Sequence, residues 1–342
     1  MNQFLIFLLV SAIKAVFIIF LLLAGFAYAT FLERRFIAII QQRIGPNRAG
    51  PFGVLQPLAD GIKLFFKEDI VPREADKVIF TLAPAITAVP ALIVLAVVPV
   101  GGDVTLFGYH TSLGLADINV GVLYILAVIS ISVYGVVLAG WASANKYAML
   151  GGLRSSAQMI SYELAMGLSL LAPIMLVGSM SLGDIIDAQR GIWFIFVQPI
   201  AGIIFIITIF AETNRAPFDL PEAEQELTAG YHAEYSGMKF AAFYMAEYMK
   251  MIAVSAIAAA MFFGGYRFFG MENLLGGWLG PFILLAKVIA GLLLMVWVRA
   301  TLPRMRYDQL MSFGWKFLLP LSLANAGVTA LLIVLNVYPV YA

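Results

Sequence analysis

Long apolar stretches, spaced along the whole chain, constrain this sequence more than any other feature. A helix needs about 20 mostly apolar residues to cross the hydrocarbon of a bilayer, because that layer is about 30 Å thick. No soluble domain or fixed-period repeat interrupts the pattern, so residues 1–342 are predicted to form a single all-α membrane domain. Eight stretches are predicted to span the membrane: 3–32, 77–99, 117–141, 157–178, 192–212, 240–264, 280–301 and 316–338.

Composition supports the membrane prediction and excludes several other classes of protein. Hydrophobic residues make up 62% of the chain and charged residues 12%. Soluble domains average about 45–50% apolar and about 25% charged residues. A soluble chain this apolar would expose large apolar patches and associate through them. A secreted scaffold, a nucleic-acid-binding protein and a disordered chain are therefore excluded, and no nucleic-acid partner is expected.

The positions of the basic residues predict the orientation of the spans. Most of the 21 Lys and Arg residues lie in alternate loops, at 33–77, 145–156, 213–239 and 299–316. Because Lys and Arg are enriched in cytoplasmic loops, both termini are predicted to lie on the outer, periplasmic side. The first helix is interpreted as retained, since its signal-peptidase-like Ala27-Tyr28-Ala29 follows no positively charged n-region.

One segment of the first inner loop has the pattern of an amphipathic helix. Apolar residues recur at helical spacing from Val54 to Phe65, whereas Asp60 and Lys63 lie on another face. We expect this helix to lie in the membrane interface. It is either a passive anchor or one wall of a site for a ligand with a polar head and an apolar tail. Asp60 disfavours the simple anchor, because a carboxylate gains nothing from anionic lipids.

The scarcity of metal-binding side chains bounds the cofactor chemistry. The chain has no cysteine, which excludes disulfides, iron–sulfur ligation and thiolate zinc sites. Its two histidines, His110 and His232, fall on opposite sides of the membrane in the predicted topology. One chain therefore cannot form a bis-histidine haem site or a metal site with several histidines. We expect this chain to bind no cofactor or metal, so that any redox centre belongs to a partner.

The first inner loop also carries a basic motif with turn residues. Arg34 and Arg35 follow Glu33 directly. Taken alone, they are explained equally well by a functional role and by a positive-inside anchor that reaches lipid headgroups. Gly45-Pro46-Asn47 farther along favours a tight turn. The motif therefore indicates a shaped loop.

The third inner loop, at 212–235, is acidic on a side where basic residues are expected. Its carboxylates are interleaved with apolar residues and run directly into the span that begins at 240. Clustered carboxylates at a membrane edge repel one another, which raises some of their pKa values and allows them to exchange protons. We favour proton uptake or relay over a merely solvated loop. The carboxylates are those of Glu212, Asp219, Glu222, Glu224, Glu226 and Glu234.

Further charged side chains fall within the predicted spans. A charge at the bilayer centre costs about 2.5–3.5 kcal/mol on insertion scales, so such a residue predicts a function. Glu247 and Lys250 are three residues apart. In a purely structural alternative, the two charges only neutralise each other. Glu163 has no such neighbour in its own helix and is the better candidate for a proton relay. Lys14 and Lys287 are also costly, and no role is assigned to them.

Three long motifs resemble one known family. They are Glu33-Arg-Arg with Gln41-Gln-Arg-Ile-Gly-Pro-Asn-Arg48, then Gly53-Val-Leu-Gln-Pro-Leu-Ala-Asp-Gly-Ile-Lys63, then Glu212-Thr-Asn-Arg-Ala-Pro-Phe-Asp-Leu-Pro-Glu-Ala-Glu224 with Glu226 and Gly230. In this order they are similar to the motifs of the H-type membrane subunit of the proton-pumping NADH:quinone oxidoreductase, respiratory complex I. The likeness extends over essentially the whole chain, including the eight predicted spans.

The resemblance implies a subunit at the heel of that complex, where the membrane arm meets the peripheral arm. Quinone is then the substrate, and the FMN and iron–sulfur clusters lie on partner subunits. Carried onto this sequence, the resemblance assigns five residues to the quinone tunnel: Arg34, Arg35, Asp60, Lys63 and Phe218. It assigns others to an acidic proton path that leads toward the pumps: Glu163, Glu212, Asp219, Glu222, Glu224, Glu226 and Glu247, with Arg299 as a counter-charge.

The same resemblance sets the expected partners and location. The partners are the other membrane-arm subunits, the quinone-site peripheral subunits, quinone and lipids. A bacterial inner (plasma) membrane is preferred over a mitochondrial inner membrane.

Three alternatives remain open. The first is the homologous membrane subunit of a hydrogenase or formate-oxidising complex, in which we would not expect Glu222-Ala-Glu-Gln-Glu226 with Tyr231-His-Ala-Glu. The second is a stand-alone ion transporter, which would usually show inverted repeats, and none is seen. The third is a purely structural anchor, which Glu163 and the acidic loop disfavour.

Overall fold

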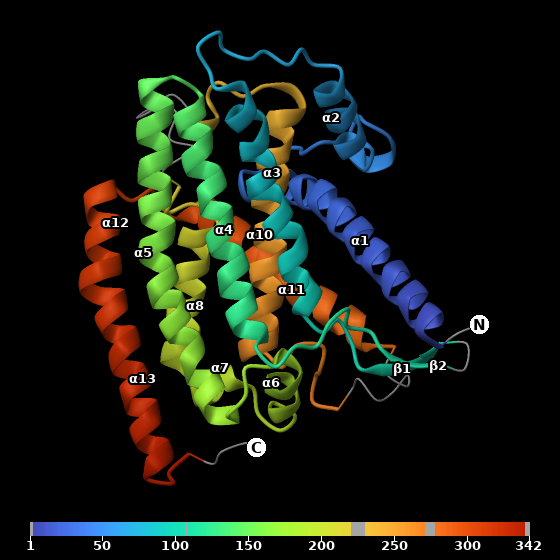
Figure 1. Cartoon of the computed structure of the whole chain (residues 1–342), viewed down its shortest axis with the longest axis vertical. Coiled ribbons are helices and arrows are strands. Elements are labelled where there is room, and N and C mark those ends of the chain that lie inside the picture. Colours follow the sequence, from blue (N-terminus) through green and yellow to red (C-terminus); the bar gives the residue numbers. More distant parts are fainter. Residues whose placement is uncertain (1–2, 107–108, 220–229, 271–277, 339–342) are drawn as a thin grey trace.

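The protein folds into a bundle of long helices (Figure 1). The computed structural model describes residues 3–106, 109–219, 230–270 and 278–338. The long helices are α1 (Gln3–Ile40), α3 (Lys77–Ile93), α4 (Gly121–Ala142), α5 (Lys146–Val177), α8 (Pro199–Glu212), α10 (Gly237–Phe262), α11 (Gly280–Thr301) and α13 (Leu319–Val334). The short helices are α2 (Gln56–Phe65), α6 (Leu182–Ala188), α7 (Phe194–Val197) and α12 (Tyr307–Phe313), and single helical turns lie at Pro51–Gly53, Val94–Val97 and Gly230–His232.

The bundle has two distinct ends. α2 lies at one of them, together with the beginning of α5 and of α10 (Figure 1). The other end carries α6 and a short antiparallel hairpin of β1 (Asp103–Leu106) and β2 (Tyr109–Ser112). We call these the α2 end and the hairpin end. The fold is therefore helical as predicted, with one small β-ribbon added between α3 and α4.

α10 is the central helix of the bundle. Over its most apolar 18 residues 83% are buried, against 6% for α1 and 17% for the continuous helix that runs from α12 into α13. Small buried residues such as Ala253, Ala256 and Ala260 let the neighbouring helices approach α10 closely. α1 crosses the bundle obliquely at its edge, where its apolar side chains stay exposed (Figure 1). Hydrocarbon tails solvate such a surface without cost.

Seven helices in the described part of the chain are long and apolar enough to cross a membrane. The remaining predicted span, at residues 192–212, is not one continuous helix. It is divided into the short α7 and the 14-residue α8. The interruption falls at Gln198, with φ −127° and ψ 62°, directly before Pro199. Proline disfavours helical geometry in the residue before it and lacks an N–H, so it begins a new helix.

Several helices also extend beyond the predicted limits. α1 continues to Ile40, and α5 begins at Lys146 instead of at residue 157. Hydropathy marks only the apolar part of a helix, whereas a capping residue marks its beginning. Asn145 is that cap for α5, because its side-chain oxygen accepts a hydrogen bond of 2.9 Å from the Tyr147 N–H.

The predicted amphipathic helix is present as α2. None of its residues is buried, and its apolar face is exposed at Leu58, Ile62 and Phe65. A side-chain ion pair of 2.6 Å between Arg34 and Asp60 joins it to α1. The helix itself is thus confirmed, whereas its position in a membrane interface stays a prediction.

The two lysines left without a role both bond near the hairpin end. Lys14 Nζ donates hydrogen bonds of 2.6 Å to Thr111 Oγ1 and to the Ser112 carbonyl of β2. Lys287 Nζ donates to three backbone carbonyls that follow α10, those of Phe263 (2.6 Å), Gly265 (2.8 Å) and Arg267 (2.6 Å). These lysines therefore hold connecting segments against the bundle.

Candidate functional site

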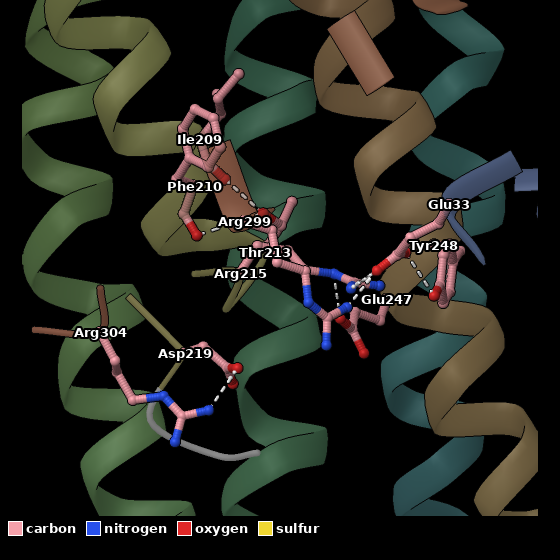
Figure 2. A network of polar contacts seen from close by, with 10 residues as sticks. All are labelled: Glu33, Ile209, Phe210, Thr213, Arg215, Asp219, Glu247, Tyr248, Arg299 and Arg304. Carbon is pink, nitrogen blue, oxygen red and sulfur yellow. Dashed lines mark hydrogen bonds and ion pairs between the residues drawn. The ribbon is translucent and has the colours of Figure 1, made fainter. Parts of the chain in front are cut away.

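A buried guanidinium, that of Arg215, joins segments that are far apart in the sequence. Its side chain is 2% exposed, and its Nη1 lies 3.0 Å from Oε1 of Glu33 on α1. Its Nε lies 2.6 Å from Oε1 of Glu247 on α10 (Figure 2). Two carboxylates thus compensate one cation. Such compensation is required because a buried charge without a partner loses its hydration at a cost of several kcal/mol.

Glu33 receives contacts from three other segments. Tyr248 Oη donates a hydrogen bond of 2.7 Å to its Oε2, and Arg299 of α11 pairs with its Oε1. The Arg215 guanidinium also lies over the Tyr248 ring, 4.5 Å from the centroid. These residues draw α1, α10, α11 and the loop after α8 together in one place (Figure 2). We call this group the ion cluster: Glu33, Arg215, Glu247, Tyr248 and Arg299.

Gln158 of α5 shapes the loop that carries Arg215. Its Nε2 donates hydrogen bonds to the carbonyls of Ala211 (2.9 Å) and Phe218 (2.8 Å). The Phe218 ring is buried and packs against Tyr162, with 5.3 Å between the ring centroids. Because a backbone bent this tightly has few internal partners, a buried amide side chain supplies them. Gln158 therefore holds both ends of the turn from Ala211 to Phe218.

Asp219 is the last residue described before the acidic stretch. Its buried carboxylate pairs with Arg304 Nη2 at 3.0 Å (Figure 2). The neighbouring Met305 N–H donates a hydrogen bond of 3.0 Å to the Pro217 carbonyl. The acidic loop is thereby attached to the segment that leads into α12.

A small cavity of about 30 Å³ adjoins the ion cluster. Glu212, at the end of α8, is 1% exposed and lines this cavity together with Lys250. Lys250 Nζ lies 3.7 Å from Glu212 Oε1. The purely structural alternative, in which Glu247 and Lys250 neutralise each other, is therefore wrong as the main pairing, because Arg215 holds Glu247. The cavity is further lined by Thr87, Val136, Thr213, Asn214, Tyr231, His232, Phe240, Phe243, Tyr244 and Glu247.

Glu163 lies on α5 and is joined to α4. Ser130 Oγ donates a hydrogen bond to Glu163 Oε1. Electrostatic interactions connect Glu163 to both Glu212 and Lys250. The structure thus brings Glu163, Glu212 and Glu247, which the sequence places on three different helices, around one lysine.

The residues assigned to a quinone tunnel lie mostly at the α2 end. Arg34 pairs with Asp60, and Arg35 Nη1 donates a hydrogen bond of 3.0 Å to the Phe52 carbonyl. Lys63 is exposed on the last turn of α2. Phe218, in contrast, is buried against Tyr162 in the loop that carries Arg215. Arg34, Arg35, Asp60 and Lys63 therefore lie at the α2 end, whereas Phe218 is buried against α5.

Three of the predicted carboxylates, Glu222, Glu224 and Glu226, lie outside the described residues. Among the residues that are described, no group of three or more His, Asp or Glu side chains is arranged to hold a metal ion.

Sequence reasoning gave no role to Glu33 or Arg215, which prove to be the centre of the ion cluster. Both stood in quoted motifs, so the signal available was the motif itself. Their burial could not be seen, because a charged residue beside an apolar span is usually an interfacial anchor.

Comparison with known proteins identifies the family. A family model described as NADH dehydrogenase matches residues 13–330. The chain belongs to the NADH dehydrogenase family. It is 53% identical over 324 residues to an H-type subunit of the NADH-quinone oxidoreductase of Geobacter metallireducens, an alignment that covers 94% of this chain and 96% of the relative. It is 55% identical over 304 residues to the H-type subunit of Protochlamydia amoebophila, covering 89% and 91% of the two chains.

These relatives confirm the resemblance predicted from the three motifs. A third relative, an H-type subunit of the NADH-quinone oxidoreductase of Geobacter sulfurreducens, is 53% identical over 317 residues, which cover 92% of this chain and 94% of the relative. The relatives are bacterial and the match is nearly full-length. With seven helices in the described residues that are long and apolar enough to cross a membrane, this member of the NADH dehydrogenase family is a multi-pass membrane subunit of the H type.

Proposed function

We propose that this chain forms much of the quinone tunnel of a proton-pumping NADH:quinone oxidoreductase and couples quinone reduction to proton translocation. The observation that carries the proposal is the buried ion cluster beside the cavity of Glu212 and Lys250. Buried ionisable groups inside a membrane domain are costly and are retained where charge or protons must move. The relatives, named as H-type subunits of NADH-quinone oxidoreductases, supply the reaction.

The α2 end is the proposed region of quinone entry and binding. A quinone has a polar ring and a long apolar tail, and α2 offers an exposed apolar face beside the Arg34–Asp60 pair. Arg35, held by the Phe52 carbonyl, lies close by in the chain and adds positive charge. The residues proposed to line or guard the tunnel are Arg34, Arg35, Asp60, Lys63 and Phe218, the last by fixing the loop that borders it.

The proposed proton path runs from the acidic loop into the bundle. Reducing a quinone to its quinol takes up two electrons and two protons, which changes the charge next to the acidic loop. Coupled carboxylates respond to such a change by exchanging protons. Coupling also requires an element with two arrangements, and we propose the loop at 212–235 for it. The path consists of Glu163, Glu212, Asp219, Glu222, Glu224, Glu226 and Glu247, with Arg299 as a counter-charge.

The proposed assembly agrees with the lack of cysteine in the sequence. Since the chain contains none, it has no ligand set for an iron–sulfur cluster. In this proposal electrons reach the quinone from partner subunits, which carry FMN and iron–sulfur clusters. The other partners are membrane-arm subunits and lipids.

The proposed location is the inner membrane of a bacterium, with both termini on the outer side. In this topology α7 and α8 together make the eighth crossing. Basic residues at the α2 end favour the cytoplasm for that end.

The test uses the complete complex in native membranes. Arg35→Ala and Glu212→Gln are expected to lower piericidin-sensitive NADH:quinone reduction and its coupled proton pumping. Electron transfer from NADH to ferricyanide should persist, because it does not involve the membrane arm. The matched control is Asp308→Asn, which removes an exposed carboxylate paired with exposed Arg306. Normal quinone turnover and pumping in both test variants would refute the proposal.

Purification separates the remaining alternatives. Tagged chain extracted in mild detergent should bring flavin, iron–sulfur signals and inhibitor-sensitive quinone reductase activity with it. Co-purification of a nickel hydrogenase would instead assign the chain to the hydrogenase-type complex, and a stable isolated chain would favour a transporter.

A further inference from the structure

Glu212 and Lys250 both line two small cavities. The first is the cavity of about 30 Å³ beside the ion cluster. The second cavity is smaller, about 10 Å³, and is also lined by both residues. Its other walls are mostly apolar: Pro90, Ala91, Val94, Ile129, Ser132, Ala253 and Val254. The pair therefore borders both cavities.

The pair is held loosely. The 3.7 Å from Lys250 Nζ to Glu212 Oε1 exceeds the about 2.7–2.9 Å of a direct charge-assisted hydrogen bond. Both carboxylate oxygens of Glu212 are buried and accept no hydrogen bond from the described residues. A structural ion pair would be expected to close this distance, because buried polar groups are nearly always hydrogen-bonded. A direct proton transfer within the pair therefore requires the flexible Lys250 side chain to close this gap by about 1 Å, to hydrogen-bonding distance.

Lys250 is surrounded by carboxylates from three helices. Glu212 of α8, Glu163 of α5 and Glu247 of α10 itself all act on it electrostatically. The other buried cation, Arg215, already pairs with Glu33 and Glu247. The two cations differ chemically, since arginine stays protonated in proteins and a buried lysine can release its proton. Of the two, Lys250 is the one that can exchange a proton with its neighbours.

We propose that Lys250 is a proton-carrying residue that links Glu163 to Glu212. In one step the ammonium Nζ gives a proton to a carboxylate oxygen of Glu212, which leaves a neutral amine and a neutral carboxylic acid. In the other step the amine takes a proton from the carboxylic acid of Glu163, which becomes a carboxylate. Together the two reversible steps move one proton between the two glutamates. The proposal rests on the proton path of the proposed function and adds a named link to it.

Substituting Lys250 in the complete complex, reconstituted into liposomes, tests the proposal. Lys250→Met removes both the charge and the proton, whereas Lys250→Arg keeps the charge and cannot release the proton. Both variants are expected to lose proton pumping per NADH oxidised, with NADH-to-ferricyanide transfer retained. The matched control is Lys239→Met, on the same helix, whose lysine pairs with the half-exposed Asp69; it should pump normally.

Each outcome decides the role of Lys250. Normal pumping by Lys250→Met overturns the proposal, because neither charge nor proton is then needed. Loss in Lys250→Met with normal pumping in Lys250→Arg also overturns it, because Lys250 would then be a fixed counter-charge. If Lys250→Arg does not assemble, Lys250→His decides, since imidazole can carry a proton. More pumping in Lys250→His than in Lys250→Met supports the proposal, and equal pumping overturns it.

Glu212→Gln distinguishes this inference from the proposed function. If that variant loses pumping while the Lys250 variants keep it, the proton path stands and only the lysine link is wrong. If Glu212→Gln and Arg35→Ala are both normal, the proposed function itself fails.

Discussion

The ion pair of 2.6 Å between Arg215 and Glu247 fastens the loop after α8 to the central helix α10. The same guanidinium reaches Glu33 on α1, so one side chain decides how three segments meet. Every group in this arrangement belongs to the chain itself.

Replacing Arg215 by Met is therefore expected to destabilise the protein strongly. It leaves the buried carboxylate of Glu33 and the partly buried one of Glu247 with less compensation. Breaking a buried pair costs about 3–5 kcal/mol. The measurements are the amount of assembled complex on native gels and its thermal unfolding. Arg306→Met is the control, because its 78%-exposed side chain forms only a surface pair and should leave stability unchanged. Equal stability of the two variants would contradict the prediction.

The Arg34–Asp60 pair predicts an effect on quinone affinity without an effect on assembly. The pair is partly exposed, so it contributes only about 0–1 kcal/mol to stability. Charge reversal in Arg34→Asp or in Asp60→Arg should raise the KM for a short-chain quinone, and the double variant should restore part of the loss. The KM of all three variants is compared with that of the wild type. Unchanged KM values in both single variants would place the quinone elsewhere.

Gly151 of α5 lies in close contact with the backbone of Gly230, at the end of the acidic loop. A Cβ built on Gly151 would lie 2.6 Å from the Cα of Gly230, a backbone atom that cannot turn away. Gly151→Ala should therefore displace Gly230–His232 and destabilise the protein by about 1–3 kcal/mol, as overpacking does. Gly167→Ala, on the same helix, meets only Leu126 Cδ1 at 3.8 Å and serves as the control. Thermal unfolding of both variants checks the prediction, which equal midpoints would refute.

Lys287 is expected to have a structural role at the hairpin end. Its ammonium donates to three carbonyls after α10, and hydrogen bonds of charged groups contribute about 1.5–3 kcal/mol each. Lys287→Met should lower the thermal stability of the complex and leave the KM and turnover of quinone reduction unchanged. Lys316→Met, at an exposed lysine, is the matched control. A selective loss of quinone turnover at unchanged stability would show that Lys287 acts in the reaction instead.

Much of the fold followed from the sequence alone. Runs of apolar residues predicted the helices. In hydrocarbon every backbone N–H and C=O group must bond within the protein, and a helix satisfies them all within one segment. The periodicity from Val54 to Phe65 predicted α2 with nearly its observed limits. Pro199 was visible as well, yet hydropathy averages over a break of one residue, so the division into α7 and α8 was missed.

Less of the candidate site could be predicted. Glu163, Glu212 and Glu247 were found because a carboxylate in an apolar helix stands out in any sequence. Which charge pairs with which was not accessible, because Glu247 and Lys250 are neighbours on one helix yet bond to different segments. Local spacing describes contacts within a helix only.

The sequence by itself determined that this chain lies in a membrane, that its three long motifs match the H-type family, and that it carries many carboxylates and no cysteine. These conclusions rest on composition and order, which a linear pattern contains. Only the tertiary structure decided that Arg215 joins Glu33 to Glu247 and that Lys250 turns toward Glu212. Those pairings depend on how α1, α5, α8 and α10 pack, and packing is set by side-chain shape across distances that no local pattern records.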